Sequence, residues 1–178
     1  MSHETPPSAH VLETGRLALR WLGHDDAGFI HELVNDSGWL QHIGDRGVRT
    51  VEDARNFIDG RIRAQYLRLG YGLNRVGLRA TDTPIGICGL VKRDWLDDVD
   101  LGYAFLPRFR GQGFATEAAA ATLEHARRVL GIERVAAIVS PGNRDSIRVL
   151  ERLGMSFLRQ ASPPDGSGED CLYARVMS

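Results

Sequence analysis

The chain of 178 residues has a formal net charge of −1, and 43% of its residues are hydrophobic and 25% charged. This length favours one domain, and this composition is typical of a soluble globular protein. A net charge near zero gives no field that would attract nucleic acid or an anionic membrane, so we expect neither as a partner.

The cysteines and the N-terminus indicate a cytoplasmic protein. Cys88 and Cys171 lie far apart and form no CxxC motif, so we expect buried thiols rather than a disulfide. No run approaches the length of about 18 apolar residues that a membrane helix needs, and no apolar signal segment opens the chain. We predict that residues 1–10 are a disordered tail and that residues 11–178 form a single domain.

In the first half of the chain, the apolar periodicity predicts a strand and two helices. Residues 16–20 alternate between apolar and polar side chains, as in a half-buried strand. An acidic pair before residue 27 can cap a helix that runs to about residue 35. Thr50 can cap a second helix, which Gly70 ends. We expect the arginines of this second helix to form its solvated face, with substrate binding as the alternative: Arg61, Arg63 and Arg68.

The second half of the chain alternates strands with helices. Strands are predicted at 72–79, 85–92, 101–106, 135–139, 155–158 and 171–176, and helices at about 113–130 and 146–153. Gly86 and Gly89 fall inside a strand, which suggests a bend or a close approach of two backbones. This order of elements predicts an α/β fold with a mixed central sheet.

The stretch from Asp100 to Ala121 carries the clearest functional signal. An apolar strand ends at Pro107, a glycine turn follows, and an alanine-rich helix begins. This order leaves unpaired backbone N–H groups at the positive end of a helix, which is a binding site for phosphate. Gly111 and Gly113 lack Cβ atoms, so the backbone can approach an anion closely.

Two common phosphate-binding motifs do not fit this turn. A Walker loop needs a lysine and a hydroxyl residue after its second glycine, where this chain has Phe114 and Ala115. A dinucleotide fingerprint needs three spaced glycines, and only two are present. An ordinary turn between strand and helix, with no ligand, is the remaining structural alternative.

Several segments resemble GCN5-related N-acetyltransferases, the GNAT family. The pattern Arg110-x-x-Gly113-x-Ala115 is similar to the acetyl-CoA loop of that family. Its flanks, with Leu101-Gly102-Tyr103 before and Thr116-Glu117-Ala118 after, resemble the branch that acetylates ribosomal-protein N-termini, the RimJ/RimL type. The similarity extends to residues 14–20 and to the segment from Asn143 to Met155.

The resemblance implies a fold and a co-substrate. The fold would have a mixed sheet of about seven strands, splayed in the middle and flanked by about four helices. Acetyl-CoA would be the co-substrate, with its pantetheine arm in the split of the sheet and no metal. The family's cofactor-binding positions correspond to the backbone of Tyr103, Phe105 and Leu106, to the loop residues Arg110, Gly111, Gln112, Gly113, Phe114, Ala115 and Thr116, and to Asn143.

The segment 38–49 is predicted as an irregular loop, because it contains glycines and many polar residues. It is nevertheless richer in apolar and aromatic residues than a plain loop requires. In the family this region lines the acceptor groove, which implies substrate contacts by Trp39, His42 and Ile43. The alternative is that Trp39 and Ile43 only close the core beneath a loop.

Transfer of an acetyl group to an amine requires a base for the amine and a proton for the departing thiolate. Asp100 stands where the family has a glutamate and is the candidate base; because aspartate is shorter, a water relay is expected. Burial and the like charges of Asp97 and Asp98 would raise its pKa. The alternative is a solvent-facing acid beside a turn.

The proton for the thiolate requires a different donor from the tyrosine that many relatives use. Leu150 occupies the tyrosine position and cannot donate, whereas Ser146 offers a hydroxyl. Either Ser146 or Asn143 could instead be a plain helix cap. The resemblance implies that the backbone N–H of Leu106 stabilises the oxyanion.

The sequence therefore predicts an acetyl-CoA-dependent N-acetyltransferase that acts by direct transfer in a ternary complex. The predicted acceptor is the N-terminal amine of a protein or peptide, and the protein would be a monomer or a homodimer. A small-molecule amine acetyltransferase and a non-catalytic acyl-CoA-binding domain remain alternatives. A serine hydrolase is excluded because no Gly-x-Ser-x-Gly elbow is present, and the six histidines show no metal-ligand spacing.

Overall fold

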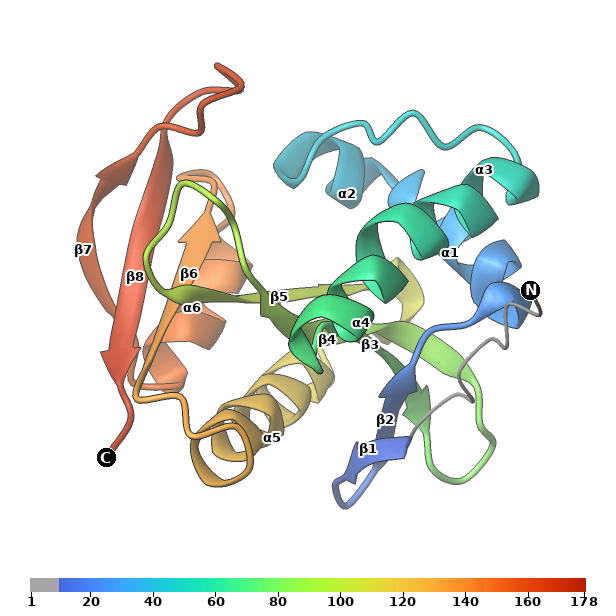
Figure 1. The fold of residues 1–178 in the computed structure, drawn as a ribbon, viewed down its shortest axis with the longest axis horizontal. Coiled ribbons are helices and arrows are strands. Elements are labelled where there is room, and N and C mark those ends of the chain that lie inside the picture. Colours follow the sequence, from blue (N-terminus) through green and yellow to red (C-terminus); the bar gives the residue numbers. More distant parts are fainter. Residues whose placement is uncertain (1–9) are drawn as a thin grey trace.

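The computed structural model describes residues 10–178 and contains one eight-stranded sheet (Figure 1). The strand order is β1-β2-β3-β4-β5-β6-β8-β7, and the pair β5/β6 is parallel while the other neighbours are antiparallel. The strands are β1 His10–Glu13, β2 Leu17–Trp21, β3 Leu73–Leu78, β4 Pro84–Val91, β5 Val99–Phe105, β6 Arg134–Val139, β7 Ser156–Ala161 and β8 Asp170–Val176.

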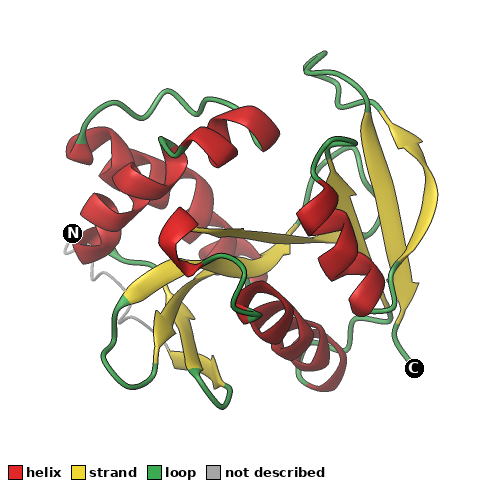
Figure 2. Cartoon of the chain, turned by 180° about the vertical axis from the view of Figure 1, so that it is seen from behind, coloured by secondary structure: helices red, strands yellow, loops and turns green. Residues whose placement is uncertain are grey.

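The helices cover both faces of this sheet (Figure 2). The α-helices are α1 Ala27–Val34, α2 Ser37–His42, α3 Val51–Phe57, α4 Ala64–Leu69, α5 Phe114–Arg128 and α6 Arg144–Arg152. Two 3-10 turns, η1 His24–Asp26 and η3 Pro107–Phe109, and a π-helical segment, η2 Ile58–Arg63, complete the set. The first four α-helices share one apolar core, and α5 and α6 pack in another on the opposite face.

The sheet splays between β5 and β6, as predicted. These two strands are paired only at Val99 with Val135 and at Asp100 with Ala136. Beyond Asp100 the strands separate, while β5 continues to Phe105 in contact with β4. The predicted α/β class with a mixed, splayed sheet is confirmed, with one strand more than expected because β1 pairs with β2.

The N-terminal prediction is only partly within the described chain. Residues 1–9 of the predicted tail lie outside the described residues. His10, the last residue of that predicted tail, instead begins β1 and is opposite Arg20 of β2.

The prediction of an irregular loop over 38–49 is wrong for its first part. Helix α2 forms there because the Asp36 carboxylate accepts hydrogen bonds from the backbone N–H groups of Gly38 and Trp39. The second predicted helix is confirmed as the continuous run of α3, η2 and α4, capped by the Thr50 hydroxyl and ended by Gly70 at a φ of +80°. Inside it, the predicted solvated face is wrong for Arg63, which is buried and donates to the Leu22 carbonyl.

Candidate active site

The open edge of β5 is the centre of the candidate site. The N–H of Leu106 donates to the Ile85 carbonyl at 2.9 Å. In an antiparallel ladder, successive residues direct their backbone groups to opposite sides. The residues that alternate with Leu106 therefore direct their N–H and C=O groups away from β4: Leu101, Tyr103 and Phe105. Beyond Asp100, the last residue of β5 paired with β6, these groups face the gap between the two separating strands. Tyr103 and the N–H of Phe105 therefore face the gap, and their binding of a cofactor stays a prediction; the Phe105 carbonyl accepts from Arg110. The N–H of Leu106 is engaged within the sheet and is not available to an oxyanion.

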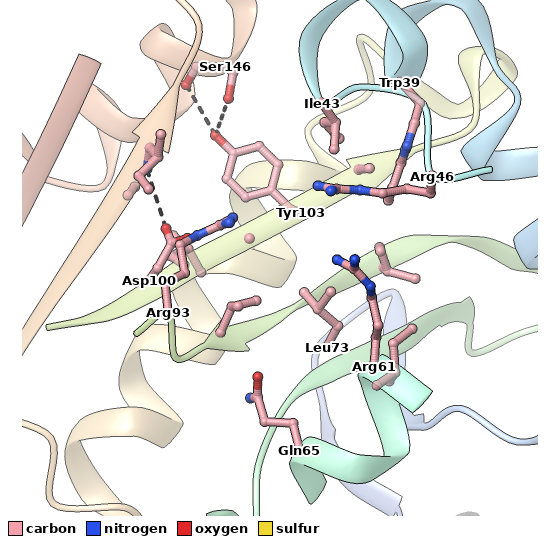
Figure 3. Close-up of a pocket in the computed structure, with 18 of the residues that line it drawn as sticks. Trp39, Ile43, Arg46, Arg61, Gln65, Leu73, Arg93, Asp100, Tyr103 and Ser146 are labelled. Atoms are coloured by element: carbon pink, nitrogen blue, oxygen red, sulfur yellow. Dashed lines mark hydrogen bonds and ion pairs between the residues drawn. The ribbon is translucent and has the colours of Figure 1, made fainter. Parts of the chain in front are cut away.

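A cavity of about 210 Å³ lies at the gap between β5 and β6, and residues from both faces of the sheet line it (Figure 3). At one end lie Ser146 and Leu150 of α6, and at the other lie residues of α2 and η2. The walls between them come from β5 and β6. The cavity therefore allows two reactants to approach from opposite faces and meet at the gap.

Asp100 is a buried carboxylate on the wall of this cavity, and only 2% of its surface is exposed. Its Oδ2 accepts a hydrogen bond from Arg93 Nε at 2.6 Å, and its Oδ1 accepts one from the Ile138 N–H at 3.3 Å. Burial raises the pKa of Asp100 to about 6, against the opposing effect of Arg93. The carboxyl thus titrates near neutrality, where a base can both accept and release a proton.

This environment corrects two expectations about Asp100. It is not a solvent-facing acid. The charge that acts on it is the Arg93 cation rather than Asp97 and Asp98, and Asp98 pairs instead with Arg134 at 2.9 Å. Arg93 follows β4 and folds back onto the start of β5.

Ser146 and Tyr103 form a hydroxyl pair at the other end of the cavity. Their hydroxyl oxygens are 2.8 Å apart, and the Tyr103 hydroxyl also lies 3.1 Å from the Ser146 carbonyl, to which it donates. Asn143, not Ser146, caps α6, because its side chain accepts from the Ser146 N–H at 3.2 Å. Burial raises the pKa of Tyr103 to about 12, so the phenol keeps its proton at neutral pH.

The glycine turn before α5 is shaped for an anion. Gly111 and Gly113 have φ angles of +73° and +82°, which favour glycine. Among residues 10–178, none accepts a hydrogen bond from the backbone N–H of Gly111, Gln112 or Gly113. These groups and the first turn of α5, Phe114 to Thr116, make the predicted nest at a helix N-terminus.

Two arginines hold this turn in place. Arg16 pairs with Glu117 at 2.7 Å, donates to the Gln112 carbonyl and stacks over the Phe114 ring. Arg110 pairs with Asp36 at 2.6 Å and donates to the Phe105 carbonyl. The Arg110 side chain thereby connects the turn to α2, and the backbone is left to bind the phosphate.

Gly113→Ala is expected to weaken coenzyme A binding by about 10-fold, because a Cβ at a left-handed residue costs about 1–2 kcal/mol and distorts the nest. That Cβ would also lie 3.4 Å from Arg16 Nη2. Gly131→Ala is the matched control, since Gly131 has a φ of +66°, follows the other end of α5 and has nothing within 4 Å of its Cβ position. Calorimetric titration should show the loss for Gly113→Ala alone. Equal affinities in both variants would refute a phosphate site at this turn.

Only two of the three residues predicted to contact the acceptor line the cavity. Trp39 and Ile43 line the cavity, and Trp39 also belongs to the apolar core beneath α1 and α3. His42 is not a lining residue; its Nδ1 lies 2.9 Å from the Ser140 hydroxyl, after β6. The sequence did not indicate Arg46 or Arg93, and it favoured a solvated role for Arg61, although all three line the cavity.

Residues 10–178 contain no cluster of three or more His, Cys, Asp or Glu side chains that could hold a metal ion. In the same residues, no helix has the length and apolar character needed to cross a membrane.

Known proteins share both the sequence pattern and the fold. The family model for the acetyltransferase (GNAT) domain matches residues 16–156. An uncharacterized N-acetyltransferase of Bacillus subtilis, YnaD, is 28% identical over 169 residues, which cover 93% of this chain and 96% of YnaD.

Solved structures give the same result for the fold. An acetyltransferase of the GNAT family from Bacillus anthracis superposes with a TM-score of 0.78 and 27% identity, covering 93% of this chain and 97% of that one. RimL, a ribosomal L7/L12 alpha-N-protein acetyltransferase solved in complex with coenzyme A, superposes with a TM-score of 0.79 and 20% identity, covering 95% and 98% of the two chains.

Proposed function

The chain belongs to the GNAT family of acetyl-CoA-dependent N-acetyltransferases, and we propose from this premise that its acceptor is the N-terminal amine of a protein or peptide, acetylated by direct transfer in a ternary complex. The observation that carries the proposal is the cavity through the gap between β5 and β6, with a titratable carboxylate on its wall. RimL, which shares the fold, is named for this kind of acceptor.

The pKa of Asp100 supports an α-amine as the acceptor. An α-ammonium has a pKa of about 8 and a lysine ammonium one of about 10.4. A carboxylate with a pKa of about 6 is much closer to the first than to the second. Proton transfer to Asp100, directly or through one water, is therefore far less uphill from an N-terminal amine than from a lysine side chain.

The described residues fit acetyl-CoA, which would supply the activated acetyl group as a thioester. The backbone of Tyr103 and the N–H of Phe105 face the gap and can bind an amide-bearing arm, and the nest from Gly111 to Thr116 offers N–H groups to phosphates. Asn143 lies beside Ser146 at the start of α6, where its capping role leaves its amide nitrogen for a ligand.

Asp100 and Ser146 are proposed to handle the two protons of the reaction. Asp100 removes the proton from the acceptor ammonium on the α2 face of the sheet. The Ser146 hydroxyl holds a proton at Oγ for the departing sulfur on the α6 face, and Tyr103 keeps that hydroxyl oriented. The lining residues include no cysteine and no lysine, which favours direct attack by the amine over a covalent acetyl-enzyme.

Acetylation of a peptide that carries both a free N-terminus and an internal lysine tests the acceptor. Fragment mass spectrometry should place the acetyl group on the N-terminal amine, and the same peptide with a blocked N-terminus should remain unmodified. Modification of the lysine, or of a polyamine in preference to every peptide, would overturn the proposed acceptor.

Ser146→Ala is expected to lower kcat by about 100-fold, the lower end of the range for loss of a general acid, because a serine hydroxyl is a weak proton donor to the departing thiolate. The KM for acetyl-CoA should change little. Ser156→Ala, at the exposed start of β7, is the control. Steady-state thiol release would measure both variants, and an unchanged kcat in Ser146→Ala would assign its hydroxyl to structure alone.

A further inference from the structure

The acceptor end of the cavity is strongly basic. Its charged lining residues are three arginines, Arg46, Arg61 and Arg93, and one carboxylate, Asp100, so the lining carries three positive charges against one negative. The whole chain has a net charge of −1, so this excess is local and is not a consequence of composition.

Only one of these arginines has an ion-pair partner in the cavity. Arg93 pairs with Asp100, whereas the side chains of Arg46 and Arg61 form no ion pair or hydrogen bond within residues 10–178. Two further acids interact with these arginines: Asp165, in the loop between β7 and β8, and Asp170, the first residue of β8. Hydrogen bonds with Ser167, and more weakly the nearby Arg46 and Arg93 cations, lower the pKa of Asp165. Burial raises the pKa of Asp170 against the opposing effect of Arg93. Neither acid makes an ion pair with these arginines.

The two unpartnered guanidinium groups point into the same space. Figure 3 shows Arg46 reaching the cavity from the segment after α2 and Arg61 reaching it from η2, with both guanidinium groups directed toward the central strands of the sheet. Burial and the neighbouring cations Arg61 and Arg93 lower the pKa of Arg46. Arg61 belongs to a π-helical segment, a rare form that proteins retain mainly at functional sites.

Arg46 is partly buried and Arg61 is exposed. An anion held between two neighbouring cations offsets their mutual repulsion. Guanidinium groups bind carboxylate and phosphate through paired hydrogen bonds, and they remain charged at every physiological pH. A polyamine would bring further positive charge into this space, whereas an acceptor with an anionic group beside its amine would offset the excess.

We propose that Arg46 and Arg61 form an anion subsite that receives a carboxylate or phosphate group of the acceptor, next to the amine that is acetylated. This inference rests on the proposed function and makes it narrower: the preferred acceptors are N-terminal peptides with an acidic residue close to the amine, and polyamines are poor acceptors.

Two pairs of acceptors test this subsite by kcat/KM. The first pair consists of two peptides with amidated C-termini that differ only at the second position, where one has glutamate and the other glutamine. The second pair is a free amino acid and its amide. Here the anion is the α-carboxylate of the free amino acid rather than a glutamate side chain, and the amide lacks it. The wild-type protein should prefer the glutamate peptide by about 10- to 100-fold, the range for a hydrogen bond to a charged group.

Arg61→Gln and Arg46→Gln should each bring the ratio of kcat/KM for the glutamate peptide to that for the glutamine peptide close to one. Arg68→Gln, an exposed arginine of α4 outside the cavity, should retain it. Equal kcat/KM values for the two peptides in the wild-type protein would overturn the subsite. A raised KM for acetyl-CoA in Arg61→Gln, with the preference intact, would also overturn it by assigning the arginine to the co-substrate.

The outcomes separate this proposal from the proposed function. If both peptides are acetylated equally, the peptide acceptor stands and the anion subsite fails. If neither peptide reacts but the free amino acid is preferred over its amide, the subsite stands and the peptide acceptor fails. Acetylation of a polyamine in preference to every peptide and amino acid would overturn both.

Discussion

Asp100→Asn is expected to lower kcat/KM for the acceptor by about 100- to 10,000-fold, the range for loss of a general base. Asparagine has the same shape but cannot accept the ammonium proton. Asp100 is buried and lines the cavity, so solvent cannot easily replace it. Asp97→Asn is the control, because Asp97 is an exposed acid outside the cavity.

The pH profile distinguishes a base from a structural acid. Burial raises the pKa of Asp100 to about 6, so the carboxyl is protonated and inactive below that pH and ionised above it. The wild-type kcat/KM should therefore rise with pH up to about 6, and the Asn variant should lack this limb. A variant with wild-type rates and the same limb would show that Asp100 is not the base.

Ionisation of Asp100 as the pH rises favours catalysis but lowers the stability of the fold. Because the folded-state pKa exceeds the ordinary value of 3.8, the ionised form costs stability, and this cost grows as the pH rises from about 4 to about 6. Asp100→Asn removes that titration, so thermal unfolding near pH 7 should show a folded variant. An inactive but folded protein would assign the loss to chemistry rather than to misfolding.

Gly89→Ala is expected to destabilise the protein by at least about 3 kcal/mol, because overpacking against backbone cannot be relieved by a rotamer change. A Cβ at Gly89 would lie 2.0 Å from the Gly72 carbonyl oxygen and 2.8 Å from Leu73 Cα. Gly89 is opposite Leu73 of β3 and Gly102 of β5, so the strain would disturb the strands that support the cavity.

Gly28→Ala provides the matched comparison. Gly28 lies in α1, and its Cβ position has nothing within 4 Å. The same chemical change should stabilise the protein there by about 0.4–1 kcal/mol, because alanine restricts the unfolded chain. Denaturant unfolding of both variants measures the contrast. A Gly89→Ala protein as stable as the wild type would contradict the close packing of β3 against β4.

The stretch from β5 through the glycine turn into α5 could be predicted because residues within the stretch determine its structure. Pro107 ends the strand, the two glycines require positive φ angles, and the alanines favour a helix, so each signal lies within a few residues of its effect. Gly86 and Gly89 likewise indicated a close backbone approach, and a Cβ at either one would meet backbone oxygen within 2.4 Å. The functional roles assigned by resemblance to Asp100, Ser146 and Trp39 remain predictions.

The features that the sequence did not predict depend on how segments of the chain fold back onto one another. Helix α2 depends on one cap, Asp36, which Arg110 holds from 74 residues away in sequence. The partner of Asp100 is Arg93, which only the turn between β4 and β5 brings into contact with it. Arg46 and Arg61 are ordinary surface residues by composition, and only the packing of α2 and η2 over the gap brings them to one cavity.

The most direct test is the initial rate of thiol release from acetyl-CoA, with the concentrations of acetyl-CoA and a peptide acceptor both varied. Direct transfer in the gap between β5 and β6 predicts release that depends on the acceptor, with double-reciprocal lines that intersect. Parallel lines, together with a protein that becomes acetylated when the acceptor is absent, would contradict the account.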